Sequence, residues 1–213
     1  MTPPSQNGST TKPFDTDVLI VGAGPVGLTT ALALAYHRIP FVLFEANADL
    51  STETKAGTTL TRSLEIWQRF GAASKVLTRA MRVDEIGDIE RATNRSRDSV
   101  KLHLLRDETR FPFVINLPQH EMEPALRDCL PESGAIHYRH RLTSFTQTSD
   151  KVSLAFDTPD GKQTCDACYL LACDGGRSTV RDQTAMLAAF APSTSRPACK
   201  ALASIRRTLA LGA

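Results

Sequence analysis

A glycine-rich turn between two apolar segments is the feature that most constrains how this chain can fold. Residues 18–21 are four consecutive apolar residues, which is typical of a buried parallel strand. Gly22, Gly24 and Gly27 follow in the pattern G-x-G-x-x-G, and an uncharged run rich in Ala and Leu then predicts a helix to Tyr36. A strand, a glycine turn and a helix in this order are the context in which the pattern indicates dinucleotide binding.

The glycines of this turn have separate expected roles. Gly22 permits the tight turn, Gly24 lets the backbone approach a pyrophosphate, and Gly27 lets the helix pack against the strand. The start of the helix also offers free N–H groups and a positive dipole end to the phosphates. The predicted pyrophosphate-binding segment consists of Gly22, Ala23, Gly24, Pro25, Val26 and Gly27.

A second apolar segment supports this prediction. Residues 41–44 are apolar and end in Glu45, which lies 18 residues after Gly27. An acidic residue at about this distance accepts hydrogen bonds from a ribose, and its charge favours the unphosphorylated ribose of FAD or NAD over that of NADP. We therefore include Glu45 and its neighbour Ala46 in the predicted site. The alternative is a glycine-rich turn in an α/β unit that binds no nucleotide.

Size and charge exclude several classes of protein. The chain has 213 residues, 41% of them hydrophobic, which is enough for one domain or slightly more. Its net charge of +2 is too small to indicate nucleic-acid binding. Residues 18–35 are uncharged, but glycines interrupt them and Asp15 and Asp17 precede them, unlike a signal peptide. We expect no membrane span and a cytoplasmic location.

Composition also predicts boundaries along the chain. Residues 1–14 predict a disordered leader, 15–181 the folded domain, and 182–213 an atypical basic tail with nine alanines and a net charge of +3. The odd number of cysteines, five, suits a reducing compartment. Cys165 and Cys168 form C-x-x-C without a second pair, so we expect ordinary strand residues and no metal site.

The second half of the chain predicts an added sheet. Residues 151–156 alternate between apolar and polar, and a Pro-Asp-Gly turn joins them to a strand over 163–173. This hairpin leads into a buried strand, which indicates an antiparallel sheet laid over the nucleotide-binding fold. Residues 100–105 and 110–115 predict another hairpin, and the charged segment 84–99 predicts a loop or an edge.

The buried strand ends in Asp174, Gly175 and the sequence Gly-Arg-Ser, and this completes a set of motifs. The set resembles the FAD-dependent aromatic hydroxylases, the flavoprotein monooxygenases related to para-hydroxybenzoate and phenol hydroxylases. Three segments carry the resemblance: the glycine turn with Glu45, residues 55–65, and residues 117–119 with the Leu-rich helix that follows them, together with 169–178. The match extends over 15–182. It implies an α/β, Rossmann-like FAD-binding fold with an added antiparallel sheet, truncated at its C-terminal side.

The resemblance implies a role for each matching residue. The glycine turn would hold the FAD pyrophosphate and Glu45 the adenosine ribose, while Lys55 and Gly57 would line a loop beside the flavin. Arg62 would lie near the cofactor, on a phosphate, or would instead cap a helix at the surface. Gln119 would contact the middle of FAD, or bond the backbone at a helix start. Asp174 and Gly175 would lie by the ribityl-pyrophosphate region and shape the NAD(P)H approach, or form a plain Asp-Gly turn.

The chemistry that the resemblance implies belongs to the flavin. NADH or NADPH, as a transient co-substrate, would reduce FAD, and molecular oxygen would form a flavin C4a-hydroperoxide that hydroxylates a small aromatic, commonly phenolic, substrate. No catalytic triad or metal is expected. The family's second flavin motif, Gly-Asp-Ala-Ala-His, does not occur in this sequence. We therefore expect a truncated form of such an enzyme. The alternatives are a non-catalytic FAD-binding fragment or pseudoenzyme, and a different flavoenzyme or an NAD-dependent dehydrogenase.

Overall fold

The computed structural model describes residues 16–53, 57–90, 93, 95–131, 136–184 and 203–204. Two expected parts, the leader over 1–14 and most of the tail over 182–213, therefore lie outside the described residues. The strands are β1 (Val18–Val21), β2 (Phe41–Phe44), β3 (Thr58–Thr59), β4 (Met81–Val83), β5 (Glu85–Glu90), β6 (Arg95–Lys101), β7 (Val114–Asn116), β8 (Ile136–His137), β9 (Arg141–Gln147), β10 (Val152–Thr158), β11 (Gly161–Ala167), β12 (Tyr169–Ala172) and β13 (Ala203–Ser204). The helices are α1 (Pro25–Tyr36), α2 (Thr61–Arg69), α3 (Ala73–Leu77), α4 (Gln119–Arg127) and α5 (Thr179–Gln183), with short 3₁₀ turns η1 (Leu102–Leu105) and η3 (Gly175–Arg177).

A mainly parallel sheet in the order β13-β12-β1-β2-β8 forms the centre of the fold. Strand β1 pairs in parallel with β2 on one side and with β12 on the other, and β2 pairs in parallel with β8. Ile20 therefore lies beside Leu43 and Leu171, so residues from three distant parts of the chain meet in one row. The α/β class and the Rossmann-like arrangement predicted from the sequence are both present.

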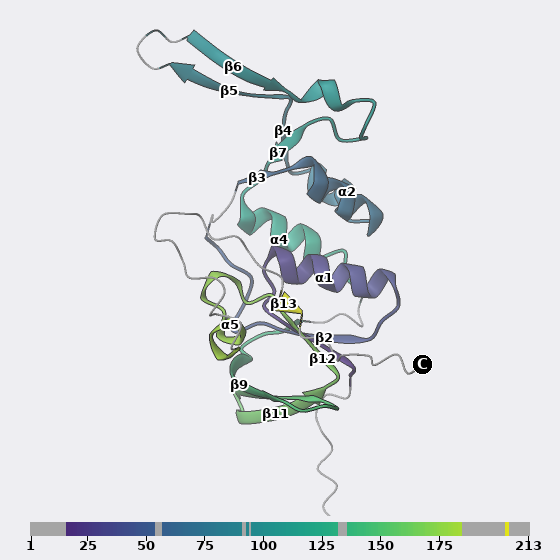
Figure 1. Ribbon diagram of the computed structural model, residues 1–213, viewed down its shortest axis with the longest axis vertical. Coiled ribbons are helices and arrows are strands. Elements are labelled where there is room, and N and C mark those ends of the chain that lie inside the picture. The colour runs from purple at the N-terminus through teal and green to yellow at the C-terminus, as the bar shows by residue number, and fades with distance from the viewer. Residues whose placement is uncertain are drawn as a thin grey trace, which may run out of the picture.

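Side chains of β1 alternate between two hydrophobic cores, as the two faces of a buried strand require. Ile20 belongs to the core under the helices, which includes Leu28 of α1 and Leu126 of α4. Leu19 belongs to the opposite core, which includes Phe156 of the antiparallel sheet. The central sheet thus lies between a helical layer and a second sheet, and both of its faces are covered (Figure 1).

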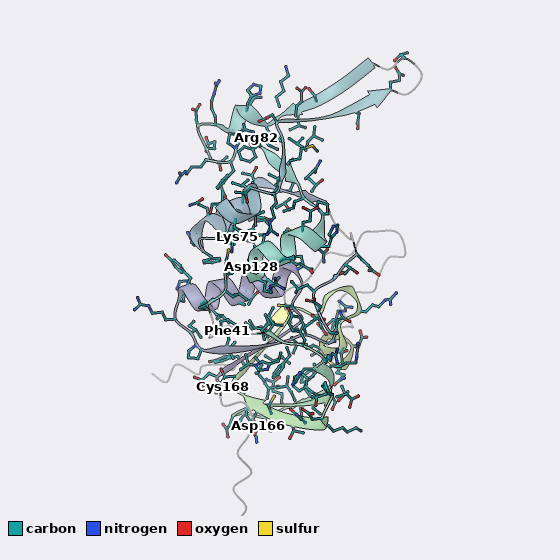
Figure 2. All side chains as sticks on the ribbon, turned by 180° about the vertical axis from the view of Figure 1, so that it is seen from behind. Phe41, Lys75, Arg82, Asp128, Asp166 and Cys168 are labelled. Carbon is teal, nitrogen blue, oxygen red and sulfur yellow. The ribbon has the colours of Figure 1, made fainter. Side chains whose placement is uncertain are left out.

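The second sheet has the order β11-β10-β9 and is antiparallel throughout. This confirms the predicted sheet portion, with one difference. The run expected as a single strand over 163–173 divides into β11 and β12 at Cys168, because the amides of Cys168 and Tyr169 both donate to the carbonyl of Asp17. Figure 2 shows the layers from behind, with Asp128 in the helical layer, Phe41 in the central sheet and Asp166 in the antiparallel sheet.

The prediction of a hairpin formed by residues 100–105 and 110–115 is wrong. Strand β6 pairs instead with β5, with Ile86 opposite Val100, and residues 102–105 form a 3₁₀ turn. Strand β7 pairs with β3 and β4. The β5–β6 hairpin extends away from the helical layer, so neither of its faces enters the core (Figure 1). Without a buried face, its sequence carries no apolar alternation by which the strands could be found.

Candidate functional site

The glycine turn joins β1 to α1, and two of its glycines are required by the chain itself. Gly22 has a φ of 100°, and a Cβ atom added there would lie 2.4 Å from the carbonyl oxygen of Cys173. A Cβ on Gly27 would lie 1.8 Å from the carbonyl oxygen of Gly22. Both distances are too short for any side chain, so these positions admit only glycine. The roles predicted for Gly22 and Gly27 in the tight turn and in helix packing agree with these contacts.

Gly24 differs from the other two glycines because nothing in the described part of the chain crowds it. The nearest atom to an added Cβ would be Oε1 of Glu123, at 3.9 Å, which is ordinary contact distance. The folded chain alone therefore does not require glycine at this position. An open position in the middle of the turn matches the predicted approach of a pyrophosphate to the backbone.

The N-terminus of α1 opens directly from this turn. Gly24 is its N-cap residue, Pro25 occupies the first helical position, and Val26 lies in the first turn. No side chain caps this helix, and its first turn contains no acidic residue. A helix of 12 residues with an uncapped start presents free N–H groups and a positive dipole end, which favour an anion.

Glu45 follows β2 and reaches back to the glycine turn. Its Oε2 accepts a 2.8 Å hydrogen bond from the backbone amide of Ala23. Its Oε1 accepts two bonds from Asn47, at 2.9 Å from the backbone amide and 2.8 Å from Nδ2. A carboxylate oxygen has two lone pairs, so Oε2 retains one acceptor position for a hydroxyl group. The neighbouring Ala46 is half-buried and holds no side chain that would fill this position.

The segment around β8 encloses the backbone of Glu45. The Glu45 amide donates to the carbonyl of His137 at 2.9 Å, and the amide of His140 donates to the carbonyl of Glu45 at 2.9 Å. The His137 ring packs against Phe44, and both burial and the nearby His140 lower the pKa of His137. The His137 ring therefore favours its uncharged form.

Gln119 and Glu123 form a buried pair on α4, with exposed fractions of 4% and 1%. The Nε2 atom of Gln119 donates a 2.6 Å hydrogen bond to Oε1 of Glu123, and the backbone amide of Ser51 donates a 3.1 Å bond to Oε2. The Oε1 atom of Gln119 is buried and has no partner in the described part of the chain. An unsatisfied buried acceptor is costly and calls for a donor beyond the described residues.

The sequence analysis did not identify Glu123. A signal was available, because residues four apart lie on the same face of a helix, which placed this acid beside Gln119. What the spacing does not reveal is that this face is the buried one.

Asp174 and Gly175 lie directly after β12, at the end of the central sheet that carries the glycine turn. The Oδ2 atom of Asp174 accepts a 3.2 Å hydrogen bond from the amide of Val180, at the start of α5. Gly175 has a φ of 80°, which favours glycine, and Arg181 donates to the carbonyl oxygens of Gly175 and Gly176. The Asp-Gly turn is therefore locally stabilised. Arg181 thus contributes to this stability through its bonds to the two backbone carbonyls.

Cys173 connects this turn to the glycine turn. Its backbone carbonyl lies against Gly22, its amide donates to the carbonyl of Val21 at 2.8 Å, and its thiol lies 3.9 Å from Oγ1 of Thr30. Burial raises the pKa of the Cys173 thiol to about 11. The side chain is thus a packing group beneath the turn and stays protonated at neutral pH.

Two of the predicted residues, Gly57 and Arg62, lie around the start of α2. The carbonyl of Gly57 accepts a 2.7 Å bond from the amide of Leu117, which precedes α4. The side chain of Arg62 is 82% exposed and forms a 2.9 Å ion pair with Glu65, and this bond lowers the pKa of Glu65. This contact agrees with the alternative of a surface arginine. Lys55 lies outside the described residues.

Two further findings concern metal sites and membrane spans. No group of three or more His, Cys, Asp or Glu side chains that could hold a metal ion occurs in the described ranges. Among the helices that the structure describes, none is both long and apolar enough to cross a membrane.

Comparison with known protein families gives one match that covers most of the chain. The family described as "FAD binding domain" matches residues 15–195. Among curated proteins, para-nitrophenol 4-monooxygenase from Pseudomonas sp. (strain WBC-3) is 28% identical over 168 residues. Aklavinone 12-hydroxylase from Streptomyces peucetius subsp. caesius is 35% identical over 190 residues. These alignments cover 78% and 81% of this chain, but only 41% and 38% of the relatives.

Solved structures give the same result. The p-nitrophenol 4-monooxygenase of Pseudomonas putida DLL-E4 superposes with a TM-score of 0.73 at 27% identity, over 78% of this chain and 42% of that protein. A flavin-dependent monooxygenase solved in complex with FAD and substrate gives a TM-score of 0.71 at 27% identity, over 81% and 32%. The chain therefore spans about two fifths or less of each of these proteins.

Proposed function

Because the chain belongs to the FAD binding domain family, we propose that it binds FAD as the N-terminal part of an FAD-dependent aromatic monooxygenase. The observation that carries this proposal is the open position at Gly24, between two glycines that the chain itself requires. FAD supplies the redox and oxygen chemistry when it is bound. The residues of this chain would bind and orient it.

Each site residue then has a proposed role. Gly22, Ala23, Gly24, Pro25, Val26 and Gly27 would bind the pyrophosphate through backbone N–H groups. Glu45 would accept a ribose hydroxyl at its remaining Oε2 position, beside the small side chain of Ala46. The unsatisfied Oε1 of Gln119 fits a hydroxyl donor from the middle of FAD. Asp174 and Gly175 would lie at the ribityl-pyrophosphate region, and Lys55, Gly57 and Arg62 would lie beside the flavin.

The proposed reaction follows the relatives' names. Those proteins are monooxygenases and hydroxylases, so we infer an aromatic, commonly phenolic, substrate, with molecular oxygen and NADH or NADPH as co-substrates. The proposal includes a cytoplasmic location and neither nucleic acid nor a membrane as a partner. The small net charge argues against nucleic acid, and the glycines within 18–35, with Asp15 and Asp17 before them, argue against a signal peptide or a membrane span.

FAD binding is the direct test. Purified protein is titrated into FAD, and quenching of flavin fluorescence gives the Kd, with NAD⁺ titrated separately by calorimetry. We expect micromolar or tighter binding of FAD and at least about tenfold weaker binding of NAD⁺, a difference of about 1.4 kcal/mol. Binding of NAD⁺ that equals or exceeds binding of FAD would favour the dehydrogenase reading and contradict the proposal.

A second candidate is an FAD-binding protein without turnover. The coverage of the relatives, 41% and 38%, favours it for the chain as given, because most of each relative has no counterpart here. The two candidates are separated by oxidation of NADH and NADPH in the presence of FAD and simple phenols. We expect FAD binding with no phenol-dependent oxidation for the 213-residue chain. Phenol-dependent oxidation would show that these residues are sufficient for catalysis.

A further inference from the structure

We propose that Glu123 is a positioning residue of the FAD site, which fixes the orientation of the Gln119 amide so that its carbonyl oxygen is left for the cofactor. The inference rests on the proposed function, because it requires that FAD binds at the glycine turn. Glu123 is almost fully buried, with 1% exposure, and the sequence analysis assigns it no role. A buried carboxylate costs free energy unless it is well hydrogen-bonded, so its presence needs a reason.

The bonds of Glu123 supply this reason. Its two carboxylate oxygens accept from two different segments, Oε1 from the side chain of Gln119 on α4 and Oε2 from the backbone of Ser51 after β2. Oε1 also lies near the glycine turn, 3.9 Å from the position that a Cβ atom on Gly24 would take. One carboxylate therefore joins α4 and the segment after Glu45 at the side of the glycine turn.

The chemistry of an amide makes this bond decisive for recognition. An amide side chain has a donor end and an acceptor end of nearly the same shape, so only its partners determine which end faces which way. A carboxylate only accepts, so it selects the NH₂ end of Gln119 at 2.6 Å. The acceptor Oε1 is left without a partner in the chain as described.

The remaining acceptor defines the group that it recognises. Phosphate oxygens only accept hydrogen bonds, so a pyrophosphate is the wrong partner for Oε1. The ribityl chain of FAD carries hydroxyl donors that ADP lacks, and the ribose hydroxyls that both ligands carry are assigned to Glu45. Glu123 should therefore contribute to the binding of FAD and much less to the binding of ADP. Because Oε1 is shielded from solvent, the hydroxyl reaches it only when the covering side chains shift on binding.

Substitution of Glu123 by Gln tests this directly. Gln at this position offers an NH₂ group to which the Gln119 carbonyl can turn, which removes the fixed orientation while the size stays the same. We expect Glu123→Gln to weaken FAD binding about five- to tenfold, the usual effect of one hydrogen bond. ADP binding, measured by calorimetry, should change less than about twofold. The matched control is Glu121→Gln, the same change on the same helix at an exposed side chain, which should alter neither affinity.

A double-mutant cycle shows whether Glu123 acts through Gln119. Gln119→Ala should weaken FAD binding as much as Glu123→Gln does, and the double variant should be no weaker than Gln119→Ala alone. Additive losses would contradict the proposal, because they would mean that Glu123 acts by another route. Equal losses for FAD and ADP in Glu123→Gln would also contradict it, since a purely structural role at the turn affects both ligands.

Folding of the variants is checked by circular dichroism and thermal melting. If Glu123→Gln does not fold, Glu123→Asp takes its place: it keeps the charge and withdraws the carboxylate from Gln119 by one methylene. The same selective loss of FAD binding supports the proposal, and FAD binding unchanged in a folded Glu123→Asp overturns it. Wild-type protein that binds neither FAD nor ADP would refute the proposed function itself. If the wild type binds both ligands and Glu123→Gln loses equal affinity for each, only the role of Glu123 is refuted.

Discussion

The backbone amide of Ala23 donates a 2.8 Å hydrogen bond to the carboxylate of Glu45, which joins the glycine turn to the end of the second strand. The two residues are 22 positions apart in the chain. This bond comes from the chain itself and fixes the turn relative to the acid. A ligand that contacts both parts therefore loses less entropy on binding.

Replacing Glu45 with Ala should separate these two parts of the site. The change removes the acceptor for Ala23 and for Asn47, and hydrogen bonds to a charged group contribute about 1.5–3 kcal/mol each. We expect FAD binding, followed by flavin fluorescence, to weaken at least about tenfold. Asp157→Ala, an exposed acid on β10, is the control and should bind FAD as the wild type does. Unchanged affinity in Glu45→Ala would refute the role of this acid.

Gly24→Ala should affect the ligand much more than the fold. The added methyl group meets no atom closer than 3.9 Å, and Ala is only a poorer N-cap residue than Gly, which costs about 1 kcal/mol or less. The same methyl group occupies the approach to the backbone that a pyrophosphate needs. We expect a melting temperature within a few degrees of the wild type and FAD binding at least about tenfold weaker. Normal FAD binding in a folded Gly24→Ala would place the phosphates elsewhere.

Gly27→Ala should affect the stability of the fold more than ligand binding. Its methyl group would lie 1.8 Å from the carbonyl oxygen of Gly22, which forces α1 away from β1. Overpacking of this kind costs about 3 kcal/mol or more. Chemical denaturation measures the loss, with Gly176→Ala as the control, because nothing lies within 4 Å of a Cβ at that position. A Gly27→Ala protein as stable as the control would show that the turn and the helix pack differently.

Cys173 should make the protein less stable in alkali. The folded pKa of its thiol is about 11, against an ordinary value of 9.0, so the folded state retains the proton that the unfolded state loses. Stability from this group is complete below pH 9 and falls as the pH rises toward 11, by at most about 2–3 kcal/mol. Urea denaturation at pH 8 and pH 10.5 measures the change. The fall should be smaller in Cys173→Ala, and an equal fall in both proteins would exclude the thiol as its source.

The sequence was sufficient for the parts of the fold whose signals are local. The apolar run of β1, the glycine spacing and Glu45 after β2 predict strand, turn, helix and acid, and the structure has all four. The alternation over 151–156 likewise predicts the strand β10. In each case a buried face repeats in the sequence with the period of its element.

Other features depend on contacts that no local pattern reveals. The β5–β6 hairpin has no buried face, so its strands gave no apolar signal and were expected to be a loop or an edge. Ser51, Gln119 and Glu123 converge from two segments about 70 positions apart, and only the tertiary structure brings them together. The ion pair of Arg62 with Glu65 at the surface is another contact that no local pattern reveals. The sequence was consistent both with an exposed Arg62 side chain and with one that contacts the cofactor.

The pairing of β1 with β12 has a consequence for how the protein is made. Ile20 of β1 lies opposite Leu171 of β12. About 150 residues are therefore synthesised after β1 before β12, one of its two neighbouring strands, can pair with it. The carbonyl group that lies against Gly22 belongs to Cys173, which is also synthesised about 150 residues after the turn. Such distant pairings slow folding and leave apolar edges exposed on the nascent chain. During translation, the glycine turn takes its final shape only after residue 173 has left the ribosome.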